Sequence, residues 1–252
     1  MARNIAVRRV AQILKSFSAE TPEMGVTELA SKVDLAKSVI HGDLAILVEE
    51  NILEKDEETG RYFLGSELFR LGQAVSKQMT LRRCAFPVMD RLAKITTETV
   101  ILGGWVNSTP CCIERINSPQ PLKLSVDIGS WFPLHAGSVG KTLLAFLPDE
   151  ERERMIERME LTRYTENTIM EISELKRRLQ EIREKGYVVS IGERLEDVAS
   201  VGAPIRNHTG DVIATLSVGG PRNRFKEGKL SSLIQLVIEA AGEISLKLGF
   251  RG

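Results

Sequence analysis

Apolar residues between positions 26 and 50 recur with the period of an α-helix, in two runs separated by a short break. The first run predicts a helix over residues 26–33, whose amino end Thr27 can cap. After a turn at residues 34–36, the second run predicts an amphipathic helix over residues 37–50. The apolar faces consist of Leu29, Ala30, Val33, Ile40, Leu44 and Leu47. Two helices joined by so short a turn form the helix-turn-helix pattern.

Strand-like segments follow the second helix and predict a hairpin. Residues 51–55 begin a strand, residues 56–60 form a turn and residues 61–65 return as the partner strand. Upstream, an apolar stripe predicts a supporting helix, formed by Ile5, Val10, Ile13, Leu14 and Phe17. These elements predict a winged helix-turn-helix domain over residues 1–65.

The outer face of the helix over residues 37–50 carries the candidate base contacts. A B-form major groove admits one helix, so Lys37, Ser38 and His41 could reach base edges there. Residues 1–70 nevertheless hold nine Lys or Arg against twelve Asp or Glu. Because non-specific affinity comes mostly from neutralised phosphates, DNA binding would need a dimer or larger assembly and a local basic cluster. That predicted cluster is Arg3, Arg8, Arg9, Lys37 and Arg61.

A connecting helix is predicted over residues 66–80. Its apolar stripe consists of Leu68, Leu71, Val75 and Met79. A stripe beyond a small domain has to be buried, either against a neighbouring protomer or against the second domain.

From about residue 80 onward, the sequence alternates between strand-like and helix-like segments. Strands are predicted at 100–106, 111–116, 123–128, 187–191, 198–204 and 212–219, and helices at 137–147, 149–159, 171–185 and 228–248. Two groups of three strands, separated by helices rather than alternating with them, indicate an α+β domain with an antiparallel sheet flanked by helices. This sensor-like domain would span residues 81–252.

Composition narrows the possible partners. The chain has 252 residues, 42% hydrophobic and 27% charged, with zero formal net charge. No global field therefore draws it to nucleic acid or a membrane, and local patches must supply any attraction. No apolar run approaches eighteen residues and no secretory leader is evident, so we expect a cytoplasmic protein without a membrane partner.

Neither a metal site nor a cofactor site is predicted. The cysteines are Cys84, Cys111 and Cys112, and the histidines are His41, His135 and His208. None of them has the spacing of a zinc site, and the adjacent Cys111 and Cys112 cannot easily bridge each other. Reduced cysteines packed within strands are the expectation.

The segment 134–142 ends in Gly-Lys-Thr and suggests a phosphate-binding loop. That motif requires glycine five residues before Gly140, where His135 stands, so the nucleotide-binding interpretation is rejected. Two interpretations remain open. Small residues at a helix amino terminus leave N–H groups available to an anion, or Gly137 and Gly140 simply allow close helix packing.

Two further segments supply candidate walls of a ligand site. Residues 212–219 alternate between a uniformly apolar face and a face that ends small and polar. Ser190, Glu193 and Ser200 lie around another predicted strand pair. A concave site with hydroxyls and an anion-favouring helix end suits a small carboxylate-bearing metabolite. The alternative is an enzyme that uses the His135–Thr142 loop to bind an anionic substrate, although no base and nucleophile stand near each other in sequence.

Four segments together resemble the IclR family of transcriptional regulators, over nearly the whole chain. They are residues 35–41 with the wing at 59–65, the loop and helix at 133–145, Ala203-Pro204-Ile205, and residues 210–221. The resemblance implies a winged helix-turn-helix, a dimerising linker helix and a GAF-like effector domain that often builds a dimer of dimers. It also implies effector contacts from residues matching Ser138, Val139, Ser190, Ser200, Ser217 and Gly219.

The chain departs from the family pattern at four positions, two in the effector site and two in the helix over residues 37–50. Ser190 stands where an acidic residue is common, and Gly219 where a second serine is common. In the recognition helix, Gly42 replaces a common arginine and Asp43 a common apolar residue. These departures leave the effector undetermined and predict an operator that differs from the family's usual one.

The sequence therefore predicts a transcriptional regulator. A homodimer or homotetramer would bind a double-stranded DNA operator, and a small metabolite in the second domain would change operator affinity. Besides the enzyme, a structural oligomerisation protein whose winged domain binds protein remains an alternative.

Overall fold

The computed structural model describes residues 5–18, 21–71 and 81–252. The chain divides into two compact units, Met1–Gln78 and Met79–Gly252. Each unit has its own buried core and is described by itself.

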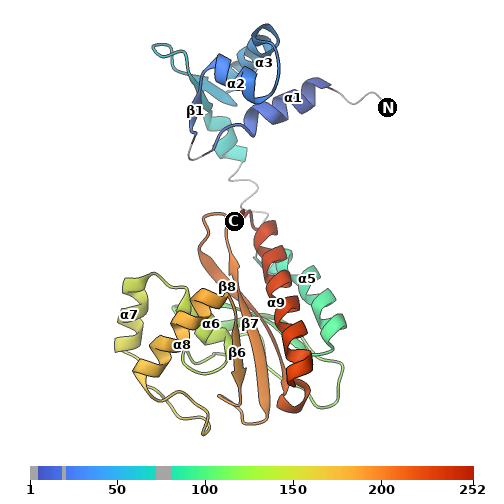
Figure 1. The fold of residues 1–252 in the computed structure, drawn as a ribbon, viewed down its shortest axis with the longest axis vertical. Coiled ribbons are helices and arrows are strands. Elements are labelled where there is room, and N and C mark those ends of the chain that lie inside the picture. Colours follow the sequence, from blue (N-terminus) through green and yellow to red (C-terminus); the bar gives the residue numbers. More distant parts are fainter. Residues whose placement is uncertain (1–4, 19–20, 72–80) are drawn as a thin grey trace. The chain divides into compact units, whose positions relative to one another are not determined.

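The first unit is a winged helix-turn-helix. Its elements are α1 (Ile5–Leu14), β1 (Glu23–Met24), α2 (Val26–Lys32), α3 (Lys37–Glu49), β2 (Leu53–Lys55) and β3 (Tyr62–Leu64) (Figure 1). The three strands form an antiparallel sheet in the order β1-β3-β2. The core includes Ile13, Leu29, Ile40, Leu44, Leu47, Leu53 and Tyr62. The predicted helices and hairpin are confirmed, and their apolar faces meet in this core.

Two details of this unit differ from the sequence expectation. Thr27 does not cap α2; the cap residue is Gly25, whose N–H donates to the Glu28 carboxylate at 2.7 Å. Glu28 thus reaches back to the N–H of the cap residue itself, which is the glutamate half of a capping box. Strand β1 was not predicted, because two residues are too short to show an alternating pattern.

The predicted connecting helix is only partly within the described residues. Residues 66–71 are helical. Residues 72–80, and with them Val75 and Met79, lie outside the described residues, as does Arg3. Among the helices that are described, none combines the length and the apolar character needed to cross a membrane.

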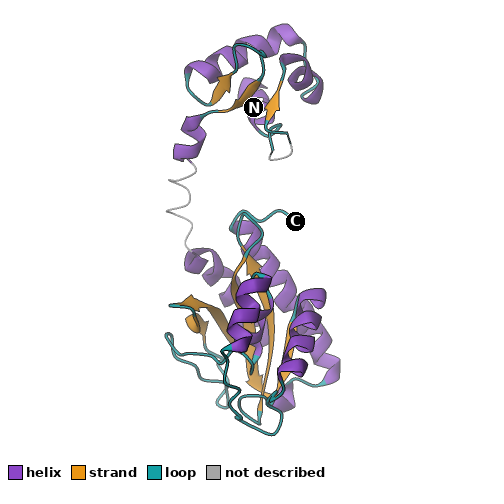
Figure 2. Ribbon diagram, turned by 90° about the vertical axis from the view of Figure 1, so that its left-hand side faces the viewer, coloured by secondary structure: helices purple, strands orange, loops and turns teal. Residues whose placement is uncertain are grey.

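The second unit is an α+β domain built on a five-stranded antiparallel sheet (Figure 2). The strands are β4 (Thr99–Val106), β5 (Thr109–Ile116), β6 (Val188–Ile191), β7 (Val198–Arg206) and β8 (Val212–Pro221), in the order β5-β4-β8-β7-β6. The helices are α5 (Leu81–Thr96), α6 (Ser138–Ala145), α7 (Asp149–Glu157), α8 (Ile172–Lys185) and α9 (Glu227–Lys247), with a short 3₁₀ helix η1 (Arg222–Arg224). The predicted fold class is confirmed.

Helices cover both faces of this sheet. Helices α5 and α9 lie on one face, and α6, with α7 and α8 outside it, lies on the other (Figure 1). The alternation along β8 sorts its side chains accordingly. Ala214, Leu216 and Val218 join the core beneath α9. Thr215 and Ser217 point to the α6 side, where Ser217 contacts Ser138.

The structure of the second unit differs from the sequence prediction in two places. Residues 123–128 form no strand, and Ile128 lies in a turn, so five strands replace the expected two groups of three. Leu124 and Val126 do alternate inward, yet they pack on a sheet face instead of pairing at its edge. Helix α5 was not predicted, although Ala85, Val88 and Met89 follow helical spacing; the helix accommodates Pro87 within it.

Candidate functional site

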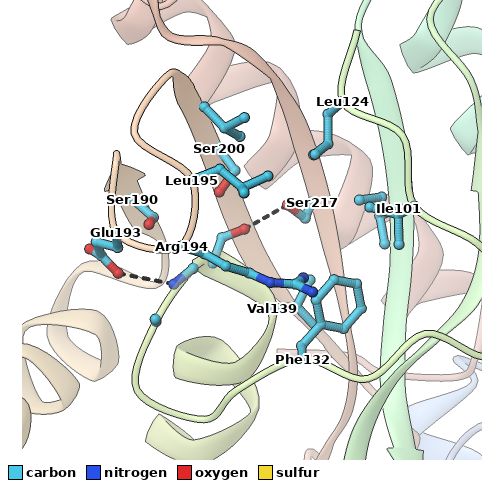
Figure 3. Close-up of a pocket in the computed structure, with 15 residues that line it drawn as sticks. Ile101, Leu124, Phe132, Val139, Ser190, Glu193, Arg194, Leu195, Ser200 and Ser217 are labelled. Carbon is cyan, nitrogen blue, oxygen red and sulfur yellow. Dashed lines mark hydrogen bonds between the residues drawn. The ribbon is translucent and has the colours of Figure 1, made fainter. Parts of the chain in front are cut away.

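A small cavity lies between the α6 side of the sheet and the loops that border it (Figure 3). Its lining residues are Ile101, Leu124, Val126, Phe132, Ala136, Gly137, Ser138, Val139, Ser190, Glu193, Arg194, Leu195, Val198, Ser200 and Ser217. The space open to the centres of water-sized molecules is about 50 Å³, and one water needs roughly 10–15 Å³ on that measure. The cavity therefore suits a compact molecule in this conformation.

Strand register brings the serines of the cavity together. Ser190 on β6 pairs with Ser200 on β7, which in turn pairs with Gly219 on β8. Ser217 lies two residues along β8, on the same face. Its hydroxyl is 2.7 Å from that of Ser138, at the start of α6 (Figure 3). Four hydroxyls from four elements thus converge on a cavity whose other lining residues are mostly apolar, with Glu193 and Arg194 as the charged exceptions.

Five of the six predicted effector contacts line this cavity; Gly219 does not. A Cβ at Gly219 would stand 2.6 Å from Leu124 Cδ2. The glycine therefore leaves room for Leu124, which forms part of the wall. The family resemblance implied a direct effector contact at this position, which in this structure is not part of the cavity lining.

Glycines shape the amino end of α6. Gly137 has a φ of 88°, a conformation that favours glycine. A Cβ at Gly140 would stand 1.9 Å from the Pro133 carbonyl oxygen, and one at Gly103 would stand 2.4 Å from Val139 Cγ1. Of the two interpretations of this loop, close packing is confirmed at Gly140.

A buried ion pair stands at the same helix end. Lys141 is fully buried and its ammonium group contacts the Glu193 carboxylate, of which only 7% is exposed. The second Glu193 oxygen accepts a hydrogen bond from Gly137 N–H at 3.0 Å (Figure 3). Burial lowers the pKa of Lys141, and the neighbouring Glu193 charge opposes that shift. The chain itself therefore supplies an anion at the amino end of α6.

Sequence reasoning missed this pair and two other residues of the site. Lys141 and Glu193 are 52 positions apart, and no local pattern joins them. Arg194 and Leu195 line the cavity from the loop after β6. Their one signal was proximity to Glu193, which the sequence had already indicated as part of a wall.

The loop that suggested an enzyme carries structural side chains. His135 is buried, its Nε2 lies 2.9 Å from the Thr162 carbonyl oxygen, and its ring stacks on Tyr164 at 5.8 Å between centroids. Lys141, the residue that would meet a phosphate in a nucleotide-binding loop, is paired with Glu193.

Cys111 and Cys112 are unbridged and buried in β5, as expected for packed strand cysteines. Burial raises the pKa of the Cys112 thiol to about 11, which disfavours its reactive thiolate. Within residues 5–18, 21–71 and 81–252, no three His, Cys, Asp or Glu side chains gather as metal ligands would.

The first unit presents most of its predicted DNA contacts on open surface. Lys37, Ser38 and His41 are exposed on α3, and Arg8 is exposed on α1. A Cβ added at Gly42 would meet no atom within 4 Å. The outer face of α3 is therefore unobstructed around Gly42, where no side chain projects from the helix.

Arg9 and Arg61 are instead engaged with carboxylates. Arg9 donates to both oxygens of Asp43, with Nη2 to Oδ1 at 2.8 Å, and this bond raises the pKa of Arg9. Arg61 contacts Glu23 and Glu28, each at 2.9 Å. The carboxylates partly neutralise both arginines, which weakens their attraction for a phosphate.

A winged helix-turn-helix unit with an open α3 face, in one chain with a domain that encloses a polar-lined cavity, defines a ligand-responsive DNA-binding regulator. Comparisons with known proteins agree. The model of the IclR helix-turn-helix domain matches residues 6–57, and that of the bacterial transcriptional regulator IclR C-terminal domain matches residues 73–246. This chain belongs to the IclR family of transcriptional regulators.

Individual relatives extend over most of the chain. The HTH-type transcriptional regulator KipR of Bacillus subtilis is 34% identical over 91% of each chain. The solved IclR of Thermotoga maritima is 29% identical over 98% of each chain, with a TM-score of 0.65. An IclR homolog from Microbacterium hydrocarbonoxydans, solved with 4-hydroxybenzoate, is 26% identical over 96% of this chain and 98% of its own, with a TM-score of 0.62. The chain is thus a DNA-binding regulator and not an enzyme.

Proposed function

We propose that a homodimer or homotetramer of this regulator binds a partly palindromic operator in the cytoplasm, and that a small carboxylate-bearing metabolite in the cavity changes operator affinity. The observation that carries the effector proposal is the convergence of Ser138, Ser190, Ser200 and Ser217 on one small apolar cavity. A few placed polar groups in an apolar cavity are typical of a small-molecule site. The relative solved with 4-hydroxybenzoate supports a ligand that carries both a carboxylate and a hydroxyl.

The DNA contacts come from α3 and the amino-terminal helix. Lys37, Ser38 and His41 share the exposed surface of α3, and Arg8 adds a positive charge on α1. The domain limits proposed are 1–65 for DNA binding, 66–80 for the dimerising linker and 81–252 for effector binding and oligomerisation. The net acidity of residues 1–70 favours paired recognition helices, because one copy offers few phosphate contacts.

Titration of the intact protein against genomic DNA fragments tests the DNA proposal. We expect saturable, salt-sensitive binding to a preferred fragment, and loss of that binding when Lys37, Ser38 and His41 are all changed to alanine. Size measurements of the variant should show unchanged oligomers. Intact DNA binding by the triple variant would contradict the assignment, and absence of any preferred fragment would favour a protein-binding winged domain.

Effector binding is tested on the same DNA complex. Short hydroxy acids, keto acids and 4-hydroxybenzoate are added in turn, and the operator dissociation constant is measured. An effector must bind one state of the protein more tightly than the other in order to change that constant. A compound that stabilises the protein to heat while leaving operator affinity unchanged would be a ligand but not an effector.

A further inference from the structure

The charges around the cavity are unevenly paired. Glu193 and Arg194 are adjacent in the chain and both line the cavity. Both oxygens of Glu193 are engaged, one by Lys141 and one by Gly137 N–H. Its charge is therefore already matched inside the protein.

Arg194 lacks such a partner. Its side chain is half-buried, and it extends across the cavity with the guanidinium 5.3 Å from the centroid of the Phe132 ring (Figure 3). Apart from this ring contact, it makes no hydrogen bond or ion pair with any residue that the structure describes. A guanidinium offers five N–H donors in a planar fork that matches a carboxylate. A partly desolvated guanidinium in a cavity wall therefore favours an anionic ligand.

The amino end of α6 is a weaker source of positive charge than the sequence suggested. Glu193 accepts from Gly137 N–H, the donor where that helix begins. A ligand carboxylate placed there would have to compete with Glu193 for that N–H. Arg194 is the remaining positive group among the residues that line the cavity.

We propose that Arg194 is the specificity-determining residue of this site, and that it selects a compact monocarboxylate by pairing with its single charge. The inference rests on the proposed effector function. The ligand's remaining polar atoms meet the hydroxyls of Ser138, Ser190, Ser200 or Ser217, and its carbon atoms meet the apolar wall. A second carboxylate would be buried beside Glu193 without a cation, which carries a desolvation penalty. Dicarboxylates are therefore rejected by charge and larger acids by the small volume.

The test measures dissociation constants by calorimetry on the full-length protein. The probes are propanoate, lactate, benzoate and 4-hydroxybenzoate, the amide of each, and succinate. Arg194→Gln removes the charge but keeps a polar side chain, and Arg194→Lys keeps the charge but loses the planar fork. Arg158→Gln, at the exposed carboxyl end of α7 and outside the cavity lining, is the matched control.

We expect at least one monocarboxylate to bind the wild type more tightly than its amide or succinate. Arg194→Gln should weaken that acid about 10- to 100-fold, the usual loss for a hydrogen bond to a charged group. The affinity of Arg194→Lys for that acid should lie between those of the wild type and Arg194→Gln. Arg158→Gln should bind the acid like the wild type. The acid-to-amide ratio on the wild type tests the monocarboxylate preference even where Arg194→Gln fails to fold, and Arg194→Lys then tests the role of the guanidinium.

Three results would overturn the inference. An Arg194→Gln affinity within twofold of the wild type would assign the charge recognition elsewhere while leaving the effector site standing. Tighter binding of an amide or of succinate would reject the monocarboxylate preference, again without rejecting the site. Failure of every probe to bind would count against both this inference and the carboxylate effector of the proposed function, whereas the DNA titrations would still stand.

Discussion

The two units secure their functional surfaces with ion pairs of contrasting environment. In the winged unit, Arg9 on α1 holds Asp43 on α3, and the two side chains retain 20% and 13% of their exposure. In the second unit, Lys141 and Glu193 retain 0% and 7%. Breaking a fully buried pair strands a charge without solvent, whereas a part-buried pair leaves its remaining charge some access to water. Charge substitutions at Arg9 or Asp43 should therefore cost less stability than those at Lys141 or Glu193.

The largest expected effect comes from Lys141→Met, which leaves Glu193 buried without its cation. The free energy of unfolding of the second unit should fall by about 3–5 kcal/mol, measured by urea denaturation. Lys141→Met combined with Glu193→Gln should recover much of that loss. Lys176→Met, which breaks the exposed pair with Glu153, is the control and should cost less than about 1 kcal/mol. Equal losses of unfolding free energy for Lys141→Met and Lys176→Met would contradict the expected difference between a buried and an exposed ion pair.

Gly140→Ala should have the next largest effect, because its Cβ would stand 1.9 Å from the Pro133 carbonyl oxygen. The backbone beside the cavity would have to move, at a cost of about 1–3 kcal/mol or more. Gly242→Ala is the matched helix control, since its Cβ meets nothing within 4 Å. That variant should stabilise the same unit by about 0.4–1 kcal/mol. Thermal unfolding distinguishes the two, and a neutral Gly140→Ala would contradict the close packing described.

A smaller effect is expected when basic residues of the winged unit are substituted. Lys37→Ala should weaken DNA binding and reduce the slope of log affinity against log salt by about 1. Arg9→Gln should leave that slope nearly unchanged, because Arg9 is engaged with Asp43. Fluorescence anisotropy from 50 to 200 mM salt measures both. If Arg9→Gln lowers the slope as much as Lys37→Ala does, then Arg9 leaves Asp43 when DNA binds.

The smallest effect concerns the wing tip. Backbone N–H groups of Thr59 and Glu58 donate to the Asp56 carboxylate and lower the pKa of Asp56 below its usual 3.8. Because the folded pKa is depressed, the stabilising contribution is present above pH 3.8 and is lost as pH falls through the lower folded value. The amide resonances of residues 58 and 59 should follow that titration, whereas in Asp56→Asn they should not. A midpoint at or above 3.8 would contradict the turn geometry.

Local periodicity accounts for what the sequence predicted well. The spacing of Ile40, Leu44 and Leu47 placed α3 correctly, and the alternation along β8 correctly divided its two faces. Residues 81–96 carry the same kind of signal, with Ala85, Val88 and Met89 on one face, so α5 was predictable from its spacing although it was not predicted. The folded helix accommodates Pro87 in its interior.

The arrangement of the cavity could not be predicted from local periodicity. Ser190 and Ser200 were indicated as a wall, but only strand register shows that they pair directly. The bond between Lys141 and Glu193 arises from tertiary packing across 52 positions. The roles of Arg9 and Gly219 also depend on neighbours from distant segments, Asp43 and Leu124. Side chains were thus identified more readily than their partners.

The adjacency of Glu193 and Arg194 has a mechanical consequence. One peptide bond joins a residue anchored to α6 to a residue whose head group extends over Phe132. A ligand that binds the guanidinium would therefore act one residue away from the side chain that holds the start of that helix. Because α6 is packed in two buried clusters, a change at its amino end would have to be accommodated by close-packed neighbours.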